Sequence, residues 1–254
     1  MVDIHCHILP NVDDGPPSIS QFINMANCAT LSGITEIFAT PHHLNGKYGN
    51  SREKILENVN RCNNLLKNEG ISLTLHPGQE LRIHSDIFKT IELGEVLTLS
   101  DKGKYILLEL PSSYIPDYTY NILYELLLRE IIPIIPHPER NMRFLDEPNL
   151  LYMMVQEGVL TQLTAGSIIG HFGKKIKLFS EKLIEHQLAH FISTDAHDVQ
   201  TRGFCLQEAY EVISRIYGID QTYYFMENAE LLKKDQSVNN DRPSPIKKKI
   251  FGLF

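Results

Sequence analysis

Two histidines flank a cysteine at the start of the chain, in the segment Val2-Asp3-Ile4-His5-Cys6-His7. Alternate side chains of a β-strand point to the same face, so His5 and His7 are able to converge on one metal ion. A second alternating pair, Asp195 and His197, lies near the other end of the sequence. Together the two pairs indicate a metal centre assembled from distant parts of the chain.

Four further apolar runs end in residue types that bind metals. The residues that follow or end these runs are His42 and His43, Glu80, Glu109, and His137. Glu109 ends the apolar run Ile106-Leu107-Leu108, where a charge is costly unless a cation or a nearby arginine compensates it. Imidazoles and carboxylates without thiolates favour Mn²⁺, Fe²⁺, Zn²⁺ or Mg²⁺, and the oxygen-rich set prefers Mn²⁺.

The loop Asp13-Asp14-Gly15 adds two more carboxylates after the first strand. Either aspartate could face the metal centre, and the sequence leaves this choice open. Cys6 alternates away from the two histidines, so we expect it to face the helices. It also lacks the C-x₅-R pattern of cysteine-based phosphatases, because the residue six positions beyond it is Val12.

Arg140 and Arg202 each lie just beyond a pair of candidate metal ligands. A guanidinium beside metal ions is electrostatically unfavourable unless the site receives a polyanion. Arginine matches phosphate oxygens in a bidentate fork. Metal ligands combined with two arginines therefore indicate hydrolysis of a phosphate ester, with a surface salt bridge as the competing role for each arginine.

Strand-like and helix-like segments alternate along most of the chain, which predicts parallel strands covered by helices. The expected strands are 2–5, 35–39, 73–76, 105–110, 131–135, 160–164 and 190–193. The expected helices are 18–31, 52–68, 85–93, 118–129, 149–157, 174–186 and 202–217. Because candidate ligands follow nearly every strand, we predict a distorted barrel of about seven strands, whose ends meet at one rim.

Composition limits the class of protein. The chain has 254 residues, of which 43% are hydrophobic, and this is enough for a sizeable core. Its net charge of −7 argues against a general nucleic-acid binder. Four scattered cysteines and the absence of a signal peptide lead us to expect a soluble, cytoplasmic protein.

The last stretch of the sequence differs from the rest. We place the barrel in residues 1–235 and expect residues 236–254 to form a polar linker and a basic-apolar tail. The tail, Lys247-Lys248-Lys249-Ile250-Phe251-Gly252-Leu253-Phe254, could contact a membrane surface or a partner. A solvated tail is the simpler interpretation.

These motifs together resemble the PHP family, named for polymerase and histidinol phosphatase domains. The matching motifs are D-I-H-C-H, D-D-G, T-P-H-H, G-Q-E, L-L-E, H-P-E-R and S-T-D-A-H. Within that family the chain looks most similar to the manganese-dependent protein tyrosine phosphatases of Gram-positive capsule and exopolysaccharide operons. The resemblance extends over essentially the whole chain and implies a distorted (β/α)₇, TIM-like barrel with three divalent ions.

The resemblance also implies which residues hold the ions. One ion would take His5, His7, Glu80 and Asp195; a second Glu80, Glu109 and His137; and a third Asp14, His42 and His197. The resemblance assigns Arg140 and Arg202 to the phosphate and counts them, with His42, Asp195 and His197, as catalytic. His43 is an extra histidine that could bind substrate or simply pack.

The implied activity is hydrolysis of phosphotyrosine by a metal-bridging hydroxide. The implied substrates are a bacterial tyrosine kinase and sugar-nucleotide enzymes. A competing hypothesis is a small-molecule phosphatase acting, for example, on histidinol phosphate; the loops 45–49 and 111–120, the latter rich in tyrosine, bear on this choice. A metal-dependent nuclease is opposed by the acidic balance of the chain. A non-enzymatic metal-binding protein is opposed by the paired arginines.

Overall fold

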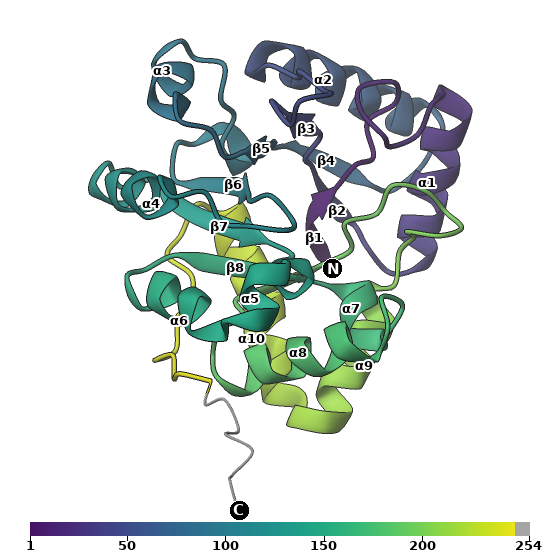
Figure 1. Ribbon diagram of the computed structural model, residues 1–254. Helices are drawn as coiled ribbons and strands as arrows, with labels where there is room; N and C mark the ends of the chain where they lie inside the picture. Colours follow the sequence, from purple (N-terminus) through teal and green to yellow (C-terminus); the bar gives the residue numbers. More distant parts are fainter. Residues whose placement is uncertain (247–254) are drawn as a thin grey trace, which may run out of the picture.

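The computed structural model describes residues 1–246 as a layered α/β arrangement. The strands are β1 (Val2–Cys6), β2 (Glu36–Ala39), β3 (His42–His43), β4 (Thr74–Pro77), β5 (Glu80–Arg82), β6 (Tyr105–Glu109), β7 (Ile132–Pro136), β8 (Leu160–Thr164) and β9 (Phe191–Ser193). The α-helices are α1 (Ile19–Leu31), α2 (Arg52–Asn68), α3 (Ile87–Glu92), α4 (Thr119–Leu128), α5 (Met142–Asp146), α6 (Pro148–Gln156), α7 (Ala165–Ile169), α8 (Lys174–Glu185), α9 (Leu206–Tyr217) and α10 (Ile219–Lys233). Two short 3₁₀ turns are η1 (Leu99–Asp101) and η2 (Pro138–Arg140). Figure 1 shows the strands at the centre with helices around them.

The strands pair in parallel and form two sheets. One has the order β1-β2-β4 and the other β3-β5-β6-β7-β8-β9. Short breaks separate β2 from β3 and β4 from β5, so each pair continues one path from the first sheet to the second. An isolated parallel bridge between Cys6 and Ala196 joins the end of β1 to the segment after β9. The expected parallel α/β arrangement is confirmed at this level.

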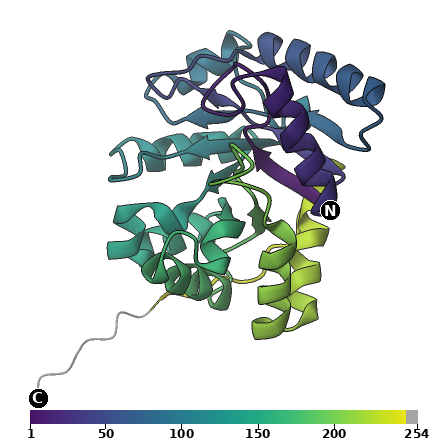
Figure 2. The same cartoon turned by 90° about the vertical axis from the view of Figure 1, so that its right-hand side faces the viewer.

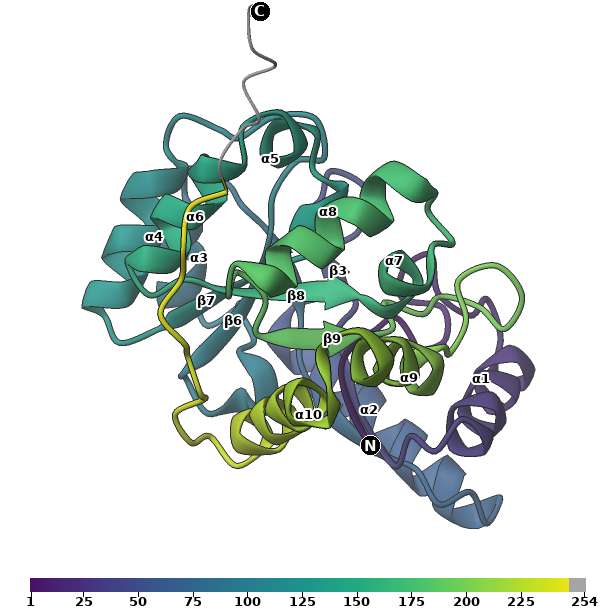
Figure 3. The ribbon, with the colours of Figure 1, turned by 90° about the horizontal axis from the view of Figure 1, so that it is seen from below.

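The strands are buried on both faces because helices cover their outer side. Every residue of β1, β6 and β8 is buried. This explains the nearly continuous apolar run of β6, since parallel strands under helices have no solvated face. Figure 2 shows the N-terminal helix α1 outside β1, and Figure 3 shows helices on several sides of the strands when the molecule is seen from below. Because the helices cover the faces of the strands, the carboxyl ends of the strands are the part of the sheets where a site can form.

Several elements differ from the expected ranges. Helix α9 begins at Leu206, so the residues from Arg202 to Cys205 belong to a loop. Helix α10 was missed because its apolar residues do not form one clear stripe. It packs against β1, β9 and α9 and therefore buries more than one face. The short elements β3, β5, α5 and α7 were also missed, because two to five residues carry too little periodicity.

The segment after α10 is attached to the body of the protein by several hydrogen bonds. The Tyr105 hydroxyl donates to the Gln236 carbonyl, and the backbone N–H of Ser244 donates to the His186 carbonyl. Ile246 is buried. Figure 3 shows this yellow segment passing α6. The proposed domain division at residue 235 stays a prediction, and the basic-apolar tail beyond residue 246 lies outside the described residues. Within residues 1–246, none of the helices is both long and apolar enough to cross a membrane.

His190 lies at one of these attachments and should make stability depend on pH. Its Nδ1 accepts the backbone N–H of Thr161, and its Nε2 lies 3.0 Å from Oδ1 of Asn240. Burial lowers the pKa of His190 from 6.5 to about 4. Between pH 6.5 and pH 4 the histidine is therefore protonated in the unfolded chain but stays neutral in the folded chain. The free energy of unfolding consequently falls as the pH drops from 6.5 towards 4.

His190→Asn should remove this contribution while keeping an acceptor for Thr161. The free energy of unfolding should fall between pH 7 and pH 4 in both proteins. We expect this fall to be smaller in the variant than in the wild type, by on the order of 3 kcal/mol. Urea unfolding at both pH values measures the difference. The same change at exposed His171 serves as the control. An identical pH dependence in wild type and His190→Asn would refute the prediction.

Candidate metal centre

Most of the expected site residues lie on the parallel strands or in the turns that follow them. The residues on strands are His5 in β1, His42 in β3, Glu80 in β5 and Glu109 in β6, and those just after strands are His7, His137, Asp195 and His197. Two of the residues that follow strands, His137 and Asp195, have positive φ angles of 39° and 52°. Such angles are uncommon outside glycine and turn the chain sharply at the strand end. These turns direct both side chains back towards the other strands.

Glu80 lies at the centre of the cluster and is fully buried. Its Oε1 is 2.9 Å from Nε2 of His137 and 3.6 Å from Nε2 of His5. Its Oε2 is 2.7 Å from Nδ1 of His42 and 3.3 Å from Nε2 of His7. One carboxylate thus contacts four imidazoles from three different segments of the chain. Burial alone would favour the neutral acid, but His5 and His42 hold the pKa of Glu80 well below its usual range.

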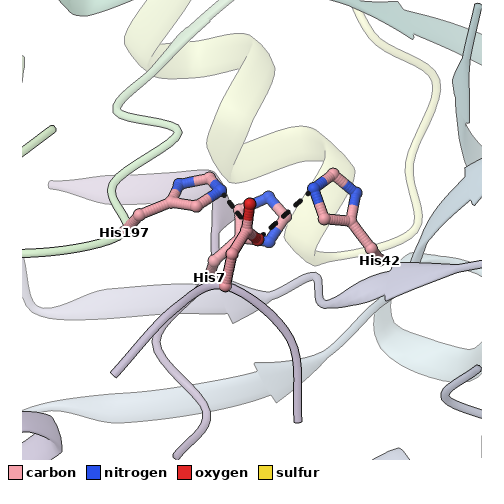
Figure 4. A group of neighbouring side chains, drawn as sticks. His7, His42 and His197 are labelled. Carbon is pink, nitrogen blue, oxygen red and sulfur yellow. Dashed lines mark ion pairs between the residues drawn. The ribbon is translucent and has the colours of Figure 1, made fainter. Parts of the chain in front are cut away.

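Asp14 approaches two imidazoles, those of His42 and His197, on the more open side. Its Oδ1 is 3.5 Å from Nε2 of His42 and 3.4 Å from Nε2 of His197. The ring of His7 stacks on that of His197 with centroids 3.8 Å apart. Figure 4 shows the rings of His7, His42 and His197 directed towards a common region. The nearby imidazole of His197 lowers the pKa of Asp14, so this carboxylate stays ionised.

The structure separates the roles of the two loop aspartates. Asp13 points to the back of His7, where its Oδ2 is 2.7 Å from Nδ1 of that ring. It also accepts the backbone N–H groups of Gly15 and His42. Gly15 permits this tight loop, since a Cβ there would lie 2.1 Å from the His7 carbonyl oxygen. Asp14 therefore faces the imidazole cluster, whereas Asp13 orients one of its members.

Asp13→Asn should weaken metal binding without removing a cluster residue. The carboxylate fixes the proton of His7 on Nδ1 and leaves Nε2 free, and such outer partners contribute about 10–100-fold to metal affinity or activity. We expect the metal concentration needed for half-maximal activity to rise by a factor of this size. The exposed Asp117→Asn variant is the matched control. Unchanged metal dependence in Asp13→Asn would show that the hydrogen bond has no such role.

Two other buried polar residues support β1, and sequence reasoning missed both. Gln162 in β8 accepts the Nδ1–H of His5 through Oε1 at 2.8 Å, which leaves Nε2 of that ring facing Glu80. Asp3 accepts the backbone N–H of Thr194 at 3.0 Å and also bonds its hydroxyl. Asp3 thereby ties β1 to the turn that carries Asp195. For Asp3 the available sequence indication was a carboxylate between the apolar Val2 and Ile4, whereas Gln162 lies between threonines and leucines in β8 and gave no such indication.

Asp195 connects the imidazoles to both arginines. Its Oδ1 is 3.5 Å from Nε2 of His5 and of His7. Its Oδ2 is 2.5 Å from Nη2 of Arg140 and 2.7 Å from Nη2 of Arg202. Burial opposes ionisation, but Arg140 and His5 hold the pKa of Asp195 well below its usual range. The two guanidinium groups, expected separately from the sequence, thus lie against one carboxylate.

A cavity of about 280 Å³ lies between the cluster and the arginines. The polar lining comes from His42, Glu80, Glu109, His137, Arg140, Asn141, Asp195, Arg202 and Ser112. Leu110, Ile135 and Phe144 contribute apolar walls. The cavity therefore combines charged groups with apolar side chains that suit an uncharged, planar group.

Glu109 has the arginine partner that the sequence left open as a second explanation for its charge. Its Oε2 is 3.0 Å from Nη2 of Arg82 and 3.8 Å from Nδ1 of His42. Burial, followed by the negative charge of Glu80, raises the pKa of Glu109 to about 7. Arg82 was not among the expected site residues. Glu109 consequently lies between Arg82 and the cluster. A salt bridge to Arg82 and a role as metal ligand do not exclude each other.

His43 does not reach the cavity. Its Nδ1 accepts the backbone N–H of Asn50 at 3.1 Å, and the ring is buried. Because alternate residues of β3 face opposite sides, His42 points to the cluster and His43 points away. The suggested substrate contact through His43 is therefore not supported, and packing is the role that its position indicates.

The donor set fits divalent metal ions. Nδ1 of His42, Oε2 of Glu80 and Nε2 of His197 are buried and lie near one another or near Asp14, but none of them makes a contact with hydrogen-bond geometry among the described residues. Buried polar atoms are almost always satisfied, so converging orphan atoms need an explanation such as an ion. Although burial lowers it, the carboxylates of Glu80 and Asp195 raise the pKa of His5. This cluster therefore attracts positive charge.

Three groups of side chains have ligand atoms within 4.8 Å of one another. They are His7, Asp14, His42 and His197; His5, His7 and Glu80; and His42, Glu80 and Glu109. These groups differ in detail from the three ligand sets that the sequence predicts. His7 also belongs to the group with Asp14 and His197, and His42 also belongs to the group with Glu80 and Glu109. His137 approaches Oε1 of Glu80, and neither His137 nor Asp195 belongs to any of the three groups. The shared members indicate one continuous cluster.

The fold and the site thus define a parallel α/β protein with an imidazole–carboxylate cluster at its strand ends. A family model described as "Capsular polysaccharide synthesis, CpsB/CapC" matches residues 1–233, and the chain belongs to this family. The resemblance inferred from the motifs is confirmed.

Individual relatives match the chain over its full length. It is 44% identical to "Tyrosine-protein phosphatase YwqE" of Bacillus subtilis (strain 168), with 100% of both chains covered. It is 38% identical to CapC of Staphylococcus aureus, again over 100% of both chains. This chain also superposes on a solved structure with a TM-score of 0.95. That structure is described as one of the "Crystal structures of YwqE from Bacillus subtilis and CpsB from Streptococcus pneumoniae, unique metal-dependent tyrosine phosphatases". That chain is 43% identical, with 98% of this chain and 100% of the other covered.

Proposed function

We propose that this chain is a metal-dependent phosphatase that hydrolyses phosphotyrosine in proteins of the capsule synthesis machinery. The observation that carries the proposal is one cavity lined both by the imidazole–carboxylate cluster and by two arginines. Family membership and the names of YwqE and its structural relative support the same activity. A tyrosine-phosphorylated bacterial kinase is the substrate we favour, with sugar-nucleotide enzymes as further candidates. The cytoplasmic location stays a prediction.

We further propose that three divalent ions, with Mn²⁺ preferred, occupy the cluster. The residues that would hold them are His5, His7, Asp14, His42, Glu80, Glu109, His137, Asp195 and His197. All of them offer nitrogen or oxygen, which suits such ions. The link between β1 and the segment after β9 favours closure of the strands into a distorted (β/α)₇ barrel of the PHP type. Closure would explain how residues from so many strands reach one site.

The roles of the chain's own residues follow from their positions. Arg140 and Arg202 bind the phosphoryl oxygens through the N–H groups that Asp195 leaves free, and they stabilise the charge of the transition state. Asp195 keeps both guanidinium groups at the cavity wall. Leu110, Ile135 and Phe144 give the phenol ring of the substrate an apolar surface and limit the access of water. Divalent ions in the cluster would supply Lewis-acid activation of water.

The proposal predicts a dependence on metal and on the leaving group. Treatment with a chelator should abolish hydrolysis of a phosphotyrosyl peptide, and added Mn²⁺ should restore it, because the cluster has no other source of activated water. The comparison of kcat/KM on this peptide, a phosphoseryl peptide and histidinol phosphate identifies the substrate class.

Two results would contradict the proposal. Full activity after complete metal removal would refute the metal-dependent mechanism. A preference for histidinol phosphate over the phosphotyrosyl peptide would favour a small-molecule phosphatase that uses the same centre. His171→Ala, at an exposed position, provides a control protein for both measurements.

A further inference from the structure

Glu139 is a fully buried carboxylate that lies outside the proposed set of metal ligands. Its Oε1 accepts two hydrogen bonds, from the backbone N–H of Thr164 at 3.0 Å and from the Ser167 hydroxyl at 2.7 Å. Burying a carboxylate is costly, and these two bonds offset only part of that cost. The position therefore needs a reason beyond packing.

The two bonds connect two structural elements. Glu139 belongs to the turn η2, which follows β7. Thr164 is the last residue of β8 and the N-cap of α7, and Ser167 lies within α7. The next residue after Glu139 is Arg140, whose guanidinium reaches Asp195 across the cavity. Glu139 thus fixes the backbone from which Arg140 extends.

Helix α7 supports Arg140 by a second route. The guanidinium carbon of Arg140 lies 5.2 Å from the centre of the Phe172 ring, a cation–π contact. Phe172 in turn packs closely on α7, because a Cβ at Gly166 would lie 3.0 Å from its ring. Helix α7 therefore fixes the backbone next to Arg140 through Glu139, and Phe172 in the loop after α7 contacts one face of the guanidinium.

His137, at the other end of the same turn, has its own anchors. Its backbone N–H donates to the Gln162 carbonyl at 2.7 Å, which continues the pairing of β7 with β8. Its ring contacts Glu80 at 2.9 Å. Loss of the Glu139 bonds should therefore displace Arg140 much more than His137.

We propose that Glu139 is the positioning residue for Arg140 and acts through its hydrogen bonds to α7. It holds the guanidinium where it meets the phosphoryl group. This inference rests on the proposed function, because it gives Arg140 the phosphate-binding role. It concerns a hydrogen-bond acceptor, so glutamine should replace Glu139 far better than alanine.

The test is a double-mutant cycle between Glu139 and Arg140. Glu139→Ala, Glu139→Gln and Ser167→Ala are each made in the wild-type chain and in Arg140→Ala. We measure kcat and KM for an aryl phosphate, inhibition by inorganic phosphate, bound metal and thermal unfolding. Glu139→Ala should lower kcat/KM by about 100-fold, the loss that a misplacement of about 1 Å can cause. In the Arg140→Ala background it should cause little further loss.

The control variants separate positioning from general stability. Glu139→Gln should retain most activity, and Ser167→Ala should give a smaller loss that also disappears in Arg140→Ala. Equal losses in both backgrounds, no loss in either, or loss of metal from Glu139→Ala would overturn the inference. Should Glu139→Ala fail to fold, Ser167→Ala decides by the same cycle. An inactive wild-type chain with metal bound would instead refute the proposed function.

Discussion

Replacing Glu80 with glutamine should nearly abolish phosphatase activity and lower the number of bound metal ions. Glu80 contacts His5, His7, His42 and His137, so its charge is shared by most of the cluster. Glutamine keeps the size but removes the charge and one acceptor oxygen. We expect a loss of more than about 100-fold in kcat/KM, since even the outer partners of metal ligands contribute about 10–100-fold. Metal analysis of the purified variant, together with turnover of an aryl phosphate, measures both effects.

Glu36→Gln is the matched control for this experiment. Glu36 lies at the amino end of β2 and contacts Lys233 and His76, on a salt-bridge network outside the cluster. This variant should bind metal and turn over substrate normally. The outcome that contradicts the prediction is Glu80→Gln protein with full metal content and wild-type turnover.

Arg140→Ala should have the second largest effect and should leave the metal content intact. The guanidinium contacts Asp195 but lies outside every candidate metal group. Removing a preorganised donor to developing negative charge typically costs about 10²–10³-fold in kcat. We expect a loss of this size with an aryl phosphate, and weaker inhibition by inorganic phosphate.

Arg129→Ala controls for loss of a surface arginine, since Arg129 pairs with Glu125 on helix α4. Arg140→Lys should recover part of the activity at most, because an ammonium lacks the planar fork of a guanidinium. If Arg140→Ala instead lost metal and kept its activity per bound ion, its assignment to the phosphate would be wrong.

The parts of the fold and site that the sequence predicts are those with a strong local pattern. Alternation in β1 places His5 and His7 on one face, and the apolar runs locate most strands. Because parallel strands share one carboxyl edge, residues as distant as His5 and Asp195 were expected to meet, and the structure brings them together. Their role as metal ligands remains a prediction.

Other features depend on tertiary contacts that no local pattern encodes. The choice between Asp13 and Asp14 depends on how the loop closes around Gly15. Gln162 and Glu139 act on residues far away in the sequence, so neither stands out in its own strand or turn. The sequence also could not distinguish the face of His43 from that of its neighbour, because β3 has only two residues.

The most direct test of the central claim is the metal content of protein purified without chelators, measured on the same sample as its turnover of a phosphotyrosyl peptide. We predict several divalent ions per chain, with Mn²⁺ the best activator, and activity that rises and falls with their occupancy. Rapid hydrolysis by protein that contains no divalent ion, or a full complement of ions with no hydrolysis under any metal, would contradict the account.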